Sequence, residues 1–249
     1  DGRGAALART HRAMASLGFA LGNARDTRDQ GIALMREAIA LQVRHRDRYG
    51  EGFTHNLLYG ALSAAGRWDQ AADVAQAGGQ IMRETDAIDD LILALANQAG
   101  SAVEIGDAER AAKAGRESLA LARGKQHRVG TAYAAAIVGR ALAQTGQAAE
   151  ALPLLEEADP IARELGGYIL QCILPHIVSG FLYAGMLGRA RTALQEGVFT
   201  LRGSGGQASA AMLATLQAQL FAAEGSWKDS QAQAAEARGV AEAIGADGL

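Results

Sequence analysis

Apolar residues recur at steps of three and four along most of the chain, as at Leu152, Leu155 and Ala158. This spacing places them on one face of an α-helix, so the pattern predicts amphipathic helices. Mostly apolar, Ala-rich segments alternate with more charged ones. The apolar segments cover residues 53–65, 88–105, 130–145, 168–187 and 209–224. We therefore expect pairs of helices, the first apolar and the second amphipathic.

A short phrase built on glycine separates the two helices of each pair. The glycines are Gly66, Gly106, Gly146, Gly188 and Gly225, at separations of 40, 40, 42 and 37 residues. Five positions after them come small residues, namely Ala71, Ala111, Ala151, Ala193 and Ser230. Glycine accepts positive φ at the end of a helix, and the small residue lets the second helix approach the first. A fixed period in this range predicts an array of stacked hairpins.

The composition agrees with packed helices, since only 3 of the 249 residues are proline and 49% are hydrophobic. A net charge of −3 argues against a general nucleic-acid surface. A single cysteine, Cys172, and no signal peptide suit a cytoplasmic chain. Residues 168–187 have the length of a membrane span, but Gln171, Pro175 and His176 inside them favour a buried central helix. Pro175 should bend or restart that helix.

The phrase resembles the tetratricopeptide repeat (TPR): a glycine, a large residue two positions later, a small one five later, and two more small residues four and seven beyond. The last two slots hold Ala75 and Gly78, Gly115 and Ser118, Leu155 and Ala158, Gly197 and Thr200, and Ala234 and Ala237. The period near 40 exceeds the usual 34, and the early tryptophan and closing proline of the family are absent. Longer repeats of this kind are similar to the helical sensor arm of MalT-like bacterial regulators of the LuxR family.

The resemblance covers nearly the whole chain and implies an all-α fold. We expect one domain over residues 1–249, a right-handed superhelix of about six antiparallel hairpins that forms part of a longer protein. First helices would line a concave groove and second helices the convex face. Such arrays bind along the groove because every repeat contributes side chains to it. Trp68 and Trp227 occupy the same slot and should pack between neighbouring hairpins.

Motifs for chemistry are lacking. The sequence has no G-x-x-x-x-G-K-[ST], no H-E-x-x-H and no C-x-x-C, and its five histidines are scattered. Cys172 lies in an apolar helix, where an inert thiol is expected. The glycine-rich residues 203–206 are interpreted as a loop between repeats. We therefore predict no catalytic residue, no cofactor and no metal.

Polar side chains in the otherwise apolar first helices are the candidate groove residues. They are Asn56, Tyr59, Asn97, Tyr133, Arg140, Gln171 and His176. A polar group in such a place needs a partner, either in the protein or in a ligand, and the sequence leaves both possibilities open. Arg140 is the sharpest candidate, because an arginine suits a carboxylate or a phosphate.

These observations favour a non-enzymatic module of a bacterial transcriptional or signalling regulator. Its partner in the groove would be a protein, a peptide or a small effector, with neither nucleic acid nor membrane bound. The alternatives are a free-standing scaffold protein and, third, an enzyme with an all-helical cavity. A small effector would require a closed, mostly apolar pocket, whereas a peptide would require an open groove lined by Asn and Arg.

Overall fold

The computed structural model describes residues 2–22, 27–201 and 207–244, and these contain twelve α-helices and no strand. The helices are α1 (Gly2–Gly22), α2 (Arg28–Arg44), α3 (Arg48–Ala64), α4 (Trp68–Glu84), α5 (Ile88–Glu104), α6 (Ala108–Gly124), α7 (Arg128–Gln144), α8 (Ala148–Leu165), α9 (Gly167–Tyr183), α10 (Leu187–Leu201), α11 (Gln207–Ala223) and α12 (Trp227–Ile244). Consecutive helices pack in pairs as six hairpins, which confirms the all-α solenoid.

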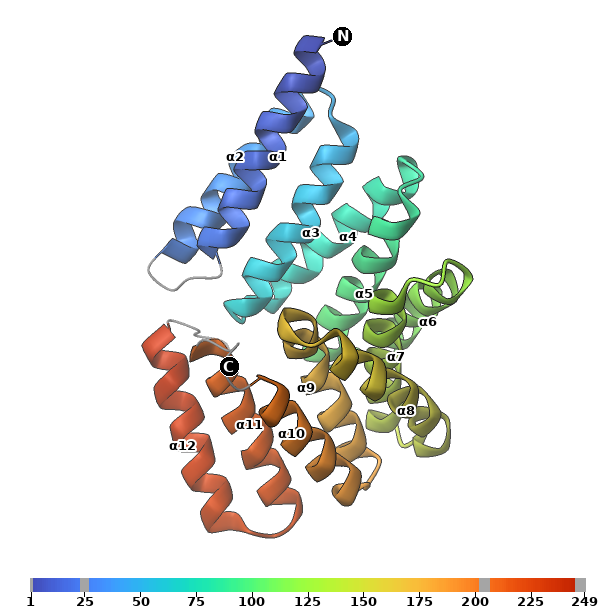
Figure 1. Cartoon of the computed structure of the whole chain (residues 1–249), viewed down its shortest axis with the longest axis vertical. Helices are drawn as coiled ribbons and strands as arrows, with labels where there is room; N and C mark the ends of the chain where they lie inside the picture. The colour runs from blue at the N-terminus through green and yellow to red at the C-terminus, as the bar shows by residue number, and fades with distance from the viewer. Residues whose placement is uncertain (1, 23–26, 202–206, 245–249) are drawn as a thin grey trace.

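The hairpins stack in two layers. The first helices, α1, α3, α5, α7, α9 and α11, each contact the next first helix along the array. Among the second helices of the described segments, only the backbones of α8 and α10 come appreciably close to each other. First helices therefore form the inner layer and second helices the outer layer. Figure 1 shows the hairpins following a curved path from the blue α1–α2 pair to the red α11–α12 pair.

Positive-φ residues mark the turns. Within hairpins the turn residues are Gly66, Gly106, Gly146, Gly185 and Gly225, with φ between 70° and 83° and separations of 40, 40, 39 and 40 residues. The prediction of Gly188 is therefore wrong, because Gly188 lies inside α10 and Gly185 closes the turn. The two glycines are three residues apart, and either choice puts a buried alanine, Ala190 or Ala193, five positions later.

The small residues after the turns bring the helices of a hairpin together, as predicted. Ala71, Ala111 and Ala151 have no exposed surface. Thr200 was placed in a small-residue slot by the Gly188 register and is exposed. Ala234 is also exposed, because no further hairpin of the described chain packs on α12.

The two tryptophans differ. Trp68 packs against the core cluster to which the neighbouring helices α2 and α3 contribute Ile32, Met35 and Leu58, as predicted. Trp227 is 67% exposed, so the prediction of a packing role is wrong. The contact between α10 and α11 is smaller than the other contacts between a second helix and the next first helix, and the preceding hairpin leaves Trp227 uncovered.

Helix α9 is the buried central helix that the sequence favoured. It packs against α7, α8, α10 and α11 and continues through Pro175 without restarting. In the part of the chain that the structure describes, no helix is both long and apolar enough to cross a membrane. The predicted loop at residues 203–206 falls outside the described residues.

Candidate functional site

The hydroxyl groups of two tyrosines approach each other on the inner layer, next to a glycine. The hydroxyl oxygens of Tyr59 on α3 and Tyr133 on α7 lie 3.5 Å apart. Gly100 on α5 lies beneath them, and a Cβ atom built there would stand 2.9 Å from the Tyr59 oxygen. The glycine thus leaves the space in which side chains from two other hairpins touch.

An ion pair and a histidine extend this contact. The Arg140 Nη1 lies 2.6 Å from a carboxylate oxygen of Glu104 and 3.2 Å from Nδ1 of His176. The Tyr133 and His176 rings have centroids 5.9 Å apart. Tyr59, Glu104, Tyr133, Arg140 and His176, which come from α3, α5, α7 and α9, are called the inner cluster below.

Burial sets the protonation of the inner cluster. It raises the pKa of Tyr59 to about 12, and it raises the pKa of Tyr133 well above the ordinary value. It also holds the pKa of His176 well below its usual range, with the positive charge of Arg140 as the second cause. At neutral pH the phenols keep their protons and the imidazole is neutral, so Nδ1 accepts a hydrogen bond from Arg140. The charges of Arg140 and Glu104 offset each other.

The structure brings together four of the seven predicted site residues: Tyr59, Tyr133, Arg140 and His176. Arg140 has a carboxylate partner inside the protein, and a ligand role for it stays a prediction. Its Nε is buried without a hydrogen-bond partner.

The other three predicted residues lie outside the inner cluster. The side-chain amide of Asn56 donates to the Asp90 carbonyl oxygen, at 3.3 Å, and its own oxygen is buried without a partner. Asn97 is buried, and Gln171 is half-buried.

Sequence reasoning missed Glu104 and Tyr168. Tyr168, on the first turn of α9, is 52% exposed, and its ring meets Phe19 of α1 edge-on at 6.3 Å between centroids. Burial raises the pKa of Tyr168, and it raises the pKa of the nearby Cys172 thiol to about 11. Glu104 could have been found as an acid 36 residues before Arg140, on the preceding inner helix.

Polar pairs also link successive outer helices. Each joins residues 33 or 34 positions apart: Arg36–Gln70, Gln76–Arg110, Arg83–Glu117, Arg123–Glu157, Glu156–Arg189 and Arg163–Glu196. We call them the outer ladder. Exposed pairs of this kind contribute about 0–1 kcal/mol each, so they fix the register of neighbouring hairpins more than they stabilise them.

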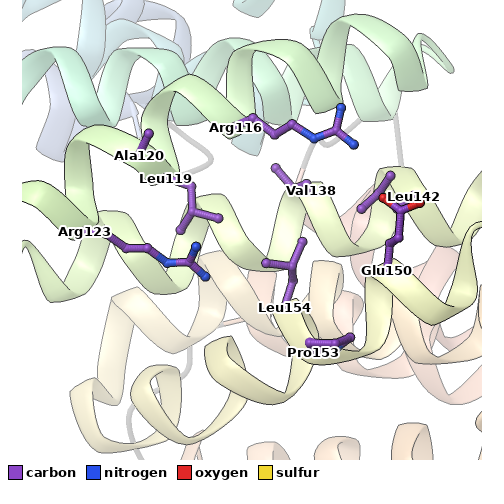
Figure 2. Close-up of a pocket in the computed structure, with 9 residues that line it drawn as sticks. All are labelled: Arg116, Leu119, Ala120, Arg123, Val138, Leu142, Glu150, Pro153 and Leu154. Atoms are coloured by element: carbon purple, nitrogen blue, oxygen red, sulfur yellow. The ribbon is translucent and has the colours of Figure 1, made fainter.

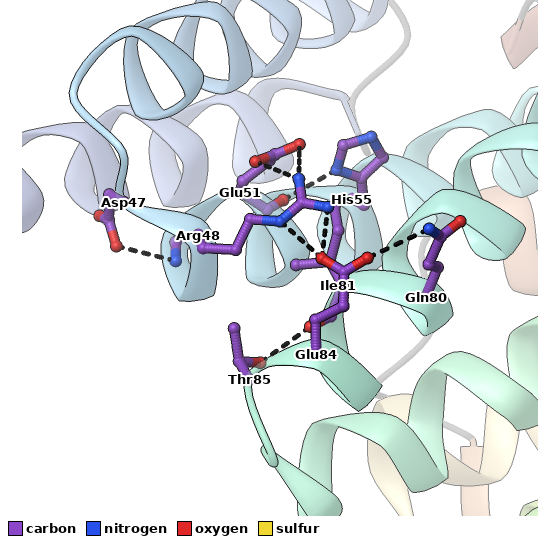
Figure 3. Close-up of polar contacts among 9 residues, drawn as sticks. Asp47, Arg48, Glu51, His55, Gln80, Ile81, Glu84 and Thr85 are labelled. Atoms are coloured by element: carbon purple, nitrogen blue, oxygen red, sulfur yellow. Dashed lines mark hydrogen bonds and ion pairs between the residues drawn. The ribbon is translucent and has the colours of Figure 1, made fainter.

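A further ion pair closes the second hairpin at its open end (Figure 3). Arg48, at the start of α3, contacts Glu84 at the end of α4 at 2.6 Å and Glu51 one turn along at 2.8 Å. Arg128 and Glu164 form the same pair in the fourth hairpin. The recurrence indicates a structural role for these charges.

No family model and no curated protein matches the chain. Solved structures match at 12% identity. The apo form of RapI aligns over 96% of this chain and 84% of its own, with a TM-score of 0.74. Aspartyl phosphate phosphatase F from Bacillus subtilis aligns over 98% and 72%, with a TM-score of 0.63. BtubC (BKLC) from P. vanneervenii aligns over 90% and 92%, with a TM-score of 0.54.

These likenesses show the fold alone, a TPR-like helical solenoid over nearly the whole chain. Fold does not fix function, because sites are placed independently on shared folds. The resemblance to MalT-like regulators stays a prediction.

Proposed function

We propose that the chain is a binding module whose inner layer receives a peptide segment of a partner protein. The observation that carries the proposal is the gathering of three of the five tyrosines, Tyr59, Tyr133 and Tyr168, on the inner helices. Tyrosine is enriched in protein interfaces because it combines a flat apolar ring with a hydrogen-bonding tip. Tyr133 and Tyr168 keep part of their surface exposed for such a contact.

The chemistry of this surface favours a peptide over a charged ligand. Arg140 and Glu104 neutralise each other, and the half-buried Gln171 and Asn56 are neutral amides. A side-chain amide both donates and accepts, which matches the alternating groups of a peptide backbone. A small effector would need an enclosed pocket of convergent groups. The two cavities of about 400 and 580 Å³ along α6, α7 and α8 lie on the outer layer.

We also propose that the module is not itself an enzyme. The pKa of Cys172 is raised to about 11, so its thiol is protonated at neutral pH, whereas a nucleophilic cysteine has a lowered pKa. His176 is neutral, but its Nδ1 is engaged by Arg140. Because one structural neighbour is an aspartyl phosphate phosphatase, the direct check is hydrolysis of acetyl phosphate. We expect no release of phosphate above the buffer rate, and a rate that scales with protein concentration would overturn this part.

We also propose that the module serves a bacterial transcriptional or signalling regulator in the cytoplasm rather than acting as a free-standing scaffold. The support is the resemblance of its long repeat to the sensor arms of such regulators. Reading the coding sequence on both sides tests the idea. An adjoining nucleotide-binding or DNA-binding domain is the expected result, and stop signals at both ends of this segment would favour the scaffold.

The binding proposal is tested with peptides selected from a random 12-residue display library against the folded chain. Affinities of the selected peptides are then measured by fluorescence anisotropy for Tyr133→Ala, Tyr168→Ala and a control, Phe199→Ala. Phe199 is an aromatic residue of α10, 75% exposed on the outer layer. Each tyrosine variant should weaken binding about tenfold or more, as interface anchors do, while the control binds like the parent.

The opposite pattern, with loss only in Phe199→Ala, would move the site to the outer layer. Selection of no peptide, together with thermal stabilisation by small metabolites that depends on Tyr133, would replace the peptide by a small effector.

A further inference from the structure

The outer ladder has one open rung between α6 and α8, although Arg123 and Glu157 form another rung between the same two helices. Arg116 and Glu150 are 34 residues apart on these helices, as Gln76 and Arg110 are on the preceding pair. Gln76 and Arg110 form their contact at 2.9 Å, and so do Glu156 and Arg189 at the following interface. Arg116 and Glu150 occupy the equivalent positions at the interface between α6 and α8, so they should form the same contact there.

Arg116 and Glu150 do not meet. Within the described segments, neither side chain has an ion-pair or hydrogen-bond partner, although their charges are opposite. A cavity of about 400 Å³ lies between α6, α7 and α8, where both residues line it. Figure 2 shows Arg116 on α6 and Glu150 on α8, with Val138 and Leu154 between the two outer helices.

The floor of this cavity is apolar. It is made by Leu119 from α6, Val138 and Leu142 from α7, and Leu154 from α8. A second cavity of about 580 Å³ adjoins it, shares Arg116 and Leu142, and adds the cationic Lys113. Together the two cavities form one furrow along the outer layer. Its α6 side carries three cations, Lys113, Arg116 and Arg123, and one acid, Glu109, and its α8 side carries Glu150. We call it the α6–α8 furrow.

We propose that the α6–α8 furrow is a second docking surface, which takes a helical segment of a partner protein that presents an acid, a large apolar side chain and a base in that order. The acid would pair with Arg116, supported by Lys113. The apolar side chain would cover Leu154 and its neighbours, and the base would pair with Glu150. The partner would then complete the rung of the ladder that this chain leaves open.

Charge complementarity and shape select this occupant. At the open rung the furrow offers Arg116 on one wall and Glu150 on the other, so a purely acidic or purely basic segment would meet repulsion from one of them. It is open to solvent along one side, whereas small-molecule sites enclose most of the ligand surface. An exposed rung adds little stability when closed, so leaving it open costs the fold little. This surface is independent of the inner cluster and of the function proposed for it.

The test uses three labelled, alanine-based helical peptides that carry Glu–Leu–Lys, Glu–Leu–Glu or Lys–Leu–Lys at four-residue spacing. Affinities are measured by anisotropy at about 0.15 M salt, where pairs beyond a Debye length are screened. The parent protein should bind Glu–Leu–Lys most tightly. Arg116→Glu should weaken that complex about tenfold and make Lys–Leu–Lys the preferred peptide, because both members of the open rung are then acidic. Glu150→Arg should make Glu–Leu–Glu the preferred one.

Two controls isolate the furrow. Arg36→Glu changes an exposed arginine of the ladder on α2, where the rung to Gln70 is closed, and should leave all three affinities unchanged. Tyr168→Ala changes the inner layer and should also leave them unchanged. Loss of binding in Tyr168→Ala would assign the peptides to the inner layer. It would overturn the furrow proposal and leave the function proposed for the inner layer intact.

Two results would overturn the furrow. One is that none of the three peptides binds at about 1 mM, or that the ranking of their affinities does not depend on the charge at position 116. The other comes from unfolding measurements on Arg116→Ala, Glu150→Ala and the double variant. A coupling between the two residues as large as that between Arg83 and Glu117, measured in the same way, would mean that the rung is closed in the free protein.

Discussion

Leu155 is held between two glycines, and this close packing leads to a sharp prediction. A Cβ built on Gly139 of α7 would lie 2.8 Å from both Cγ and Cδ2 of Leu155, and 3.2 Å from the Ala151 carbonyl oxygen. A Cβ on Gly180 of α9 would lie 2.7 Å from the same Leu155 Cδ2. Leu155 itself is fully buried on α8. It therefore has little room to yield to a methyl group on either side.

The substitution Gly139→Ala sets two effects against each other. Alanine favours a helix interior over glycine by about 1 kcal/mol. Overfilling a close contact costs about 1–3 kcal/mol. We expect the second effect to win, with a net loss of about 1 kcal/mol in the free energy of unfolding. Leu155→Ala alone should cost about 2–5 kcal/mol through the cavity it leaves.

In the Leu155→Ala background the sign should reverse. The two leucine atoms that block the new methyl group are gone, so Gly139→Ala should then stabilise by about 0.5–1 kcal/mol through helix propensity. The two substitutions would thus be coupled by about 2 kcal/mol. Gly239→Ala is the control, since Gly239 is exposed inside α12 with nothing within 4 Å of its added Cβ, and it should stabilise in either background.

The assay is equilibrium urea unfolding followed by circular dichroism, with the m-value checked in every variant because repeat arrays can lose cooperativity. If Gly139→Ala stabilised the parent as much as the Leu155→Ala variant, the two substitutions would be additive. That outcome would refute the reasoning that three helices meet at Leu155 without spare volume.

Three further predictions follow from single positions. Gly185→Ala should lower the free energy of unfolding by about 1–2 kcal/mol because φ is +74° there, while Gly188→Ala in α10 should not; equal melting temperatures would contradict the turn at Gly185. His176 is neutral when folded and binds a proton when unfolded, so stability should fall below about pH 6.5 by up to about 1.4 kcal/mol per pH unit. His176→Gln should remove that part of the slope, and parallel pH profiles would contradict it. Trp68→Ala should cost about 3 kcal/mol or more and Trp227→Ala less than about 0.5 in urea unfolding.

The sequence could predict the hairpins because their signals are local. An apolar stripe, a glycine at a helix end and a small residue five positions on act within one hairpin. The local signal gave the wrong turn residue where two glycines lie close together, at Gly185 and Gly188. The local signal also gave the wrong prediction for Trp227, because the burial of that side chain depends on the distance between its own hairpin and the preceding one.

The inner cluster was only partly predictable for a related physical reason. The sequence shows that Arg140 and His176 are polar in apolar helices. It does not show that Glu104 reaches Arg140 from α5, since that contact depends on side-chain length and on the curvature of the array. The polar pairs of the outer ladder could not be predicted from the sequence alone either. Their spacing of 33 or 34 residues can be recognised only once the period of the turns is known.

Departures from the repeat explain where both proposed surfaces arise. Positions 60, 100 and 140 are equivalent, and they hold Gly60, Gly100 and Arg140. The first two glycines leave space that tyrosine hydroxyls from other hairpins approach, whereas Arg140 fills its own slot and pairs with Glu104. Positions 76, 116 and 156 are equivalent on the outer helices, and the middle one, Arg116, is the one without its rung. The repeated residues therefore build the solenoid, and the residues that break the repeat lie at the two surfaces proposed to bind a partner.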